Sequence, residues 1–88
     1  MQPESVPMSP QLRYAIDHAT STADRIALRD KLFASQQPIV DAINKAVRLR
    51  DHYRRFYLHE VADEWARVVD STNEGLESVR KAIAELTA

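Results

Sequence analysis

The 88-residue chain has no cysteine, a single glycine and no long apolar run. The lack of cysteine excludes disulfides, thiolate metal sites and catalysis by a thiol. No apolar run approaches the roughly 18 residues that a membrane span requires, and no apolar signal-peptide core follows Met1. We therefore expect a cytoplasmic protein without a membrane contact, although export without a cleaved signal would leave no trace in the sequence.

The scarcity of glycine and of β-branched runs predicts an all-α protein. Residues 1–9 hold two prolines and have little to bury, so we expect a flexible N-terminal tail there. Residues 10–88 are long enough for one helical domain, and we expect a single one.

A heptad seam predicts a first helix over about residues 10–34. Its members recur at alternating spacings of four and three: Leu12, Ile16, Ala19, Ala23, Ile26, Asp30 and Phe33. Ser21 with Asp24 resembles a capping box that would divide this segment. The seam keeps its phase across that point, which favours one helix.

The second helix is predicted over about residues 38–70, where no glycine and no internal proline occurs. Pro38 suits the first position of a helix and ends the one before it, so the short link implies an antiparallel hairpin. The apolar stripe of this helix shifts its phase around Val61, as a stutter does.

A third helix is predicted over about residues 73–87. The preceding segment, residues 71–75, gathers poor helix formers, and Ser71 with Glu74 fits another capping box. The expected fold is a three-helix antiparallel bundle around a long central helix. The alternative is an extended helical hairpin, in which the last two helices are continuous.

The aromatic residues of the long helix are expected in the core or in an interface, where the outer helices overlap. They are Tyr53, Phe56, Tyr57 and Trp65.

The long helix is also divided by charge. Residues 41–55 carry five positive charges against two negative ones, whereas residues 56–70 carry one positive charge against four negative ones. The five cations are candidates for binding a protein partner or a nucleic acid: Lys45, Arg48, Arg50, Arg54 and Arg55. A solvated helix face is the favoured interpretation, because an isoelectric point near 6.3 is low for a nucleic-acid-binding domain.

Two antiparallel copies of the long helix would oppose their unlike charges, which motivates the hypothesis of a homodimer. No glycine-rich phosphate loop and no recognisable nucleophile occurs, so we expect no enzyme, no small-molecule substrate and no cofactor. His52, His59 and Asp63 are a weak metal pattern, and we expect no metal site. The sequence thus favours a helical, coiled-coil-like interaction or oligomerisation module, such as a scaffold, adaptor or regulatory subunit. The alternative is a nucleic-acid-binding domain that uses residues 45–55.

Overall fold

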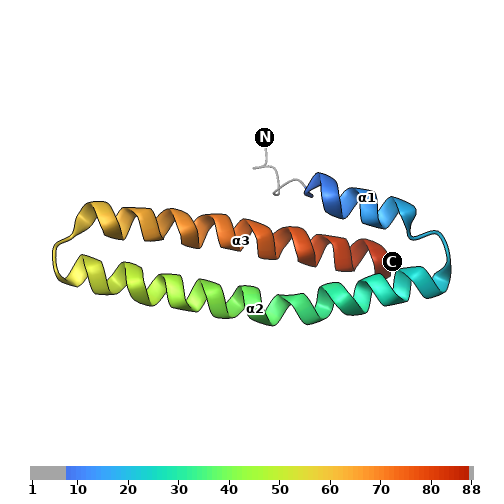
Figure 1. Cartoon of the computed structure of the whole chain (residues 1–88), viewed down its shortest axis with the longest axis horizontal. Helices are drawn as coiled ribbons and strands as arrows, with labels where there is room; N and C mark the ends of the chain where they lie inside the picture. The colour runs from blue at the N-terminus through green and yellow to red at the C-terminus, as the bar shows by residue number, and fades with distance from the viewer. Residues whose placement is uncertain (1–7, 88) are drawn as a thin grey trace.

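The computed structural model describes residues 8–87, which fold into three α-helices and no β-strand. Helix α1 spans Pro10–His18, α2 spans Thr22–Arg55 and α3 spans His59–Thr87. Helices α2 and α3 form a long antiparallel hairpin, and α1 packs beside the C-terminal part of α3 (Figure 1). The predicted all-α, three-helix architecture is confirmed, but the helices begin and end at other residues than those predicted.

The start of α1 is fixed by two hydrogen bonds of Ser9. Its side-chain oxygen accepts from the Leu12 N–H at 3.2 Å, and its backbone N–H donates to Ser78 Oγ on α3 at 3.3 Å. Met8 packs against the hydrophobic core. The remainder of the expected tail, residues 1–7, lies outside the described residues.

The predicted helix over residues 10–34 is wrong, because the chain leaves helical geometry at Ala19. Ser21 then caps α2, and its side chain accepts a hydrogen bond from the Asp24 N–H at 3.0 Å. The capping box therefore divides the segment. This division lets α1 fold back onto the hairpin, where Ile16 is buried.

Pro38 lies inside α2, so the predicted link and hairpin at residues 35–38 are wrong. Proline lacks an N–H and cannot bond the carbonyl of Ala34, at a typical cost of about 3 kcal/mol. Close to this gap, the Ser35 hydroxyl donates to the Leu32 carbonyl at 2.6 Å. Leu32 is buried and Ile39 packs against the same core, so the buried face of α2 continues on both sides of the proline. We attribute the continuity of α2 to this burial.

The predicted helix over residues 38–70 is also wrong, because the chain reverses direction directly after α2. The Leu58 N–H donates to the Tyr53 carbonyl at 2.9 Å, and the Tyr57 N–H donates to the Arg54 carbonyl at 3.1 Å. These bonds form a Schellman motif with Tyr57 in the left-handed conformation, at a φ of 62°. Glycine usually occupies this position, so the local sequence carries no turn signal.

Helix α3 runs without interruption through residues 71–75, where a break was predicted. The alternative is right only in having no break at residues 71–75, because the turn at residues 56–58 interrupts the continuous helix that it assumed over residues 38–87. One seam of alternating four- and three-residue spacings extends along the whole helix: Leu58, Ala62, Trp65, Val69, Thr72, Leu76, Val79, Ile83 and Leu86. Packing of this seam outweighs the weak helix propensity around Gly75.

The molecule is elongated, with principal extents of 53 × 32 × 18 Å. Its radius of gyration is 16.2 Å, whereas a compact domain of this length has about 12 Å. We call the end where the three helices meet the base (α1 with residues 22–38 and 76–87). The two-helix remainder is the arm (residues 39–75). The core cluster lies in the base: Ile16, Leu32, Val79, Ala82 and Leu86.

Candidate functional site

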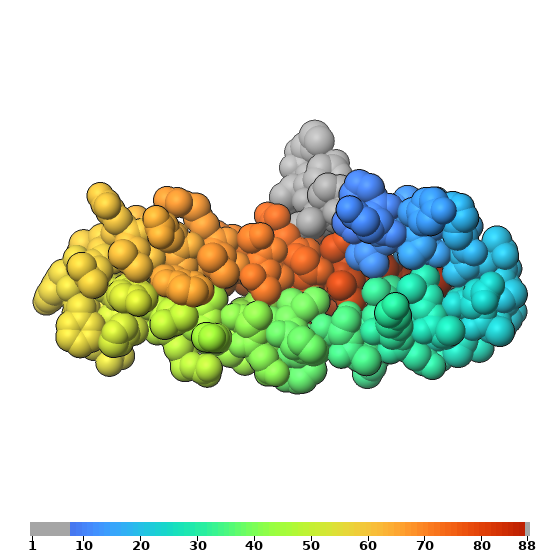
Figure 2. All heavy atoms as spheres, viewed as in Figure 1, coloured from blue at the N-terminus to red at the C-terminus, as the bar shows by residue number. Residues whose placement is uncertain are grey.

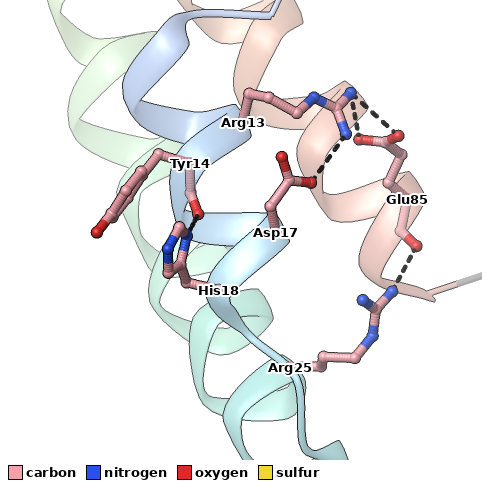
Figure 3. Close-up of polar contacts among 6 residues, drawn as sticks. All are labelled: Arg13, Tyr14, Asp17, His18, Arg25 and Glu85. Atoms are coloured by element: carbon pink, nitrogen blue, oxygen red, sulfur yellow. Dashed lines mark hydrogen bonds and ion pairs between the residues drawn. The ribbon is translucent and has the colours of Figure 1, made fainter.

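The base shows how the hairpin holds a third helix (Figure 3). Ile16 of α1 is buried in the core cluster. Arg13 Nη2 lies 3.1 Å from one carboxylate oxygen of Glu85 and 3.2 Å from the other, and Arg13 Nη1 lies 3.8 Å from Asp17. Arg25 at the start of α2 donates to the Glu85 backbone carbonyl at 3.1 Å. An apolar side chain in the core and an arginine on an α3 carboxylate thus hold α1 in place.

Among residues 8–87, no third helix lies along the arm. Val61, Val68 and Gly75 precede Ala82 at spacings of seven, so the four residues lie on one side of α3. Ala82 is fully buried in the cluster that contains Ile16 of α1, whereas Val68 is 41% exposed. Figure 2 shows α1 resting on one end of the hairpin, while only α2 and α3 make up the other end. The side of α3 that is buried in the base is therefore open in the arm.

In the arm, α2 and α3 bury only some of the apolar side chains. Ala46, Ala62 and Val69 are buried, and two of these three are alanines. The larger side chains remain partly exposed: Ile39, Val40, Ile43, Val47, Leu49, Tyr53, Val61 and Trp65. We call the open side of the arm, on which Val61 and Val68 lie, the arm face.

The four aromatic residues expected at the centre of a core are divided between the arm and the turn. Tyr53 and Trp65 are partly buried within the arm. Phe56 and Tyr57 lie at the tip of the hairpin and are 60% and 81% exposed. A core position for the latter two is wrong, because the chain reverses at these residues. Their role in an interface remains a prediction.

The hairpin sets the two charge blocks side by side. The basic block, residues 41–55, belongs to α2. The four carboxylates of the acidic block, residues 56–70, all lie on α3, which runs antiparallel beside α2. The two charge blocks therefore do not lie end to end on one helix, which removes the argument for pairing two antiparallel copies of that helix. The homodimer itself stays a prediction. In the arm, α3 carries one cation, Arg67, and these carboxylates: Glu60, Asp63, Glu64, Asp70 and Glu74.

The five candidate binding cations do not form one stripe. Arg48 and Arg55 are seven residues apart and share one side of α2, whereas Arg50 and Arg54 share another. Arg50 is partly buried, and its Nε donates to Asp51 at 3.0 Å. Lys45 is exposed near Arg48. With acidic α3 alongside, the basic side chains of α2 do not make up one continuous positive surface.

The described residues contain no group of three or more histidine and carboxylate side chains placed to hold a metal ion. His52 makes edge-to-face ring contacts with Tyr53 and Phe56, and His59 makes one with Tyr57. His52 and His59 therefore pack against aromatic rings at or near the turn of the hairpin.

A hollow of about 290 Å³ lies between α1 and α3, lined by Met8, Arg13, Lys81, Ala84 and Glu85. Another, of about 260 Å³, lies at the turn and is lined by residues 57–61.

None of the described helices combines the length and apolar character needed to cross a membrane. No protein-family model, curated protein or solved structure matches the chain. The candidate site is therefore defined by the chain's own geometry, and its main feature is the open arm face. Sequence reasoning did not single out Val61 and Val68 as a site, although the phase shift around Val61 marks the turn nearby.

Proposed function

We propose that this protein is an interaction module whose arm face binds one amphipathic helix of a partner protein. A single observation carries the proposal. The side of α3 that is fully buried at Ala82 in the base is 41% exposed at Val68 in the arm. The partner helix would continue the line of α1 and complete a three-helix bundle along the hairpin.

The length of the arm defines the length of the partner helix. Residues 59–75 of α3 lie beyond the part that α1 covers. They extend over about 25 Å at 1.5 Å per residue, which matches a partner helix of four to five turns. Burial of Val61, Val68 and the edges of Tyr53 and Trp65 would provide the apolar part of the affinity.

The charges of the arm define which edge of the partner helix faces α3 and which edge faces α2. Glu60, Glu64 and Glu74 of α3 recur at helical spacings, and none has an ion-pair partner among the described residues. In the base, an equivalent α3 carboxylate, Glu85, holds an arginine of α1. We therefore expect basic residues on the edge of the partner helix that faces α3, and acidic residues on the edge that faces α2.

The experiment is site-specific photocrosslinking in a native extract. A photoreactive phenylalanine replaces Val68, and the control carries it at Glu77, which is exposed on the opposite side of α3. The expected product joins position 68 to an amphipathic segment with a basic edge. Val68→Asp, combined with the photoreactive residue at position 61, should suppress this product while the helical content stays unchanged. Equal crosslinking from positions 68 and 77 would contradict the proposal.

A further inference from the structure

A second apolar stripe runs along α2, outside the core cluster. Ile26, Phe33, Val40 and Val47 recur at spacings of seven, so they lie on one side of the helix. Phe33 is 67% exposed, Ile26 is 44% exposed, and the two valines are partly exposed. The stripe extends over about 30 Å at 1.5 Å per residue. We call it the α2 stripe.

Two arginine–aspartate pairs flank the ends of the α2 stripe. Arg29 and Asp30 follow its first member by three and four residues, and Arg50 and Asp51 follow its last member by the same offsets. These offsets place the arginines on one edge of the stripe and the aspartates on the other. Within one chain, Arg29 Nη2 lies 3.3 Å from Asp30 Oδ1, and Arg50 Nε lies 3.0 Å from Asp51 Oδ1.

These pairs join adjacent residues, which do not face each other on a helix. All four side chains are also partly or largely exposed, so each pair contributes little to the stability of the monomer. The aspartate oxygens therefore remain open to a second cation. One edge of the stripe thus offers cations and the other offers anions, at both ends.

We propose that the α2 stripe binds a second copy of the chain, with the two α2 helices parallel and related by a two-fold axis along them. In this arrangement the arginine edge of each copy faces the aspartate edge of the other at the same height. Arg29 then meets the copy of Asp30, and Arg50 meets the copy of Asp51, in both directions. An antiparallel pair, in which position 26 faces position 47, sets Arg29 level with Asn44 and Asp30 level with Ile43 of the copy, so neither charge meets an opposite charge. Charge therefore selects the parallel orientation, and the apolar stripe supplies the affinity.

This surface is separate from the arm face. The α2 stripe lies on α2, whereas Val61 and Val68 lie on α3. Self-association and the binding of a partner helix can therefore fail independently, and one variant for each surface distinguishes the two failures.

The first test is the mass of the full chain by light scattering and sedimentation across the micromolar range. The wild type should be a dimer, and Phe33→Asp should raise the dissociation constant of the dimer more than about tenfold, because a central apolar contact is lost. Phe33 is exposed, so the variant should keep the helical content of the wild type. Val68→Asp is the matched control and should remain a dimer. A monomeric wild type at the highest concentration, or a dimeric Phe33→Asp, would overturn the proposal.

The second test determines the orientation, and the chain lends itself to it because it has no cysteine. Ile26→Cys should form a disulfide with its own copy, since a parallel pair brings the two positions together. In an antiparallel pair, position 26 faces position 47, so a product that forms only when Ile26→Cys and Val47→Cys are mixed would refute the parallel arrangement. Arg29→Asp should weaken the dimer, and Arg29→Asp with Asp30→Arg should restore it. Failure of this rescue would also overturn the charge pairing.

Discussion

The left-handed Tyr57 at the tip of the hairpin leads to a quantitative prediction for Tyr57→Gly. An L-residue in this conformation costs about 1–2 kcal/mol, and Tyr57 adopts it at a φ of 62°. Glycine removes this strain but has more freedom to lose on folding, which costs roughly 0.5–1 kcal/mol. The tyrosine ring is 81% exposed, so its removal forfeits little buried area. We expect Tyr57→Gly to stabilise the protein by about 0.5–1 kcal/mol.

The control for this prediction is Tyr57→Ala, which removes the same ring and keeps the strained backbone. The two variants should differ by about 1 kcal/mol, or by about 4–8 °C in melting temperature for a domain of this size. Urea unfolding followed by circular dichroism measures the difference, and equal slopes for the two variants show that they unfold to comparable states. Tyr57→Gly proving less stable than Tyr57→Ala would refute the assignment of position 57 to a Schellman turn.

Further variants test the helix boundaries, the core and the basic segment. Gly75→Ala should stabilise the protein by about 0.5–1 kcal/mol, since an added Cβ meets no atom within 4 Å and Gly75 has no positive φ. The control Ala42→Gly, at an exposed position of α2, should destabilise the protein by a similar amount. A lower melting temperature for Gly75→Ala would indicate a break in α3. Leu76→Ala should cost about 2–5 kcal/mol in urea unfolding, because Leu76 is buried. Leu58→Ala, at a half-exposed leucine, should cost clearly less, and equal losses would place the core elsewhere. In a gel-shift assay at low salt, a DNA duplex should not be retarded, and retardation abolished by Arg54→Glu with Arg55→Glu would favour the nucleic-acid alternative.

The sequence predicted the all-α class and the number of helices, but it placed both hairpin links incorrectly. Pro38 carries the strongest local stop signal in the chain, yet α2 continues through it. Leu32 and Ile39 pack on the core on either side, and burial of a long amphipathic face outweighs one missing hydrogen bond. Local signals at Pro38 and Gly75 were overridden by packing over many residues.

The turn at residues 56–58 could not be predicted from turn chemistry, because it contains neither glycine nor proline and uses a tyrosine in the left-handed position. The pattern nevertheless held an indirect signal. The apolar stripe predicted for residues 39–68 shifts its phase around Val61. In the structure, the residues of this stripe up to Tyr53 belong to α2, and those from Val61 on belong to α3. Of the candidate binding residues, the sequence identified the charges but not the arm face. That face is defined by where α1 stops covering α3, which only the tertiary structure determines.

The way in which α1 is attached has a consequence for the order in which the chain folds. Contacts between α2 and α3 begin at the turn and can close progressively along the hairpin, whereas α1 closes the longest loops. Its hydrogen bonds to Ser78 and Glu85 join residues 69 and 72 positions apart in the chain. Such closures have the highest entropic cost, and the helix that makes them is only nine residues long. Helix α1 should therefore dock last and open first, with amide protons in α1 exchanging well ahead of those around Leu76 and Val79.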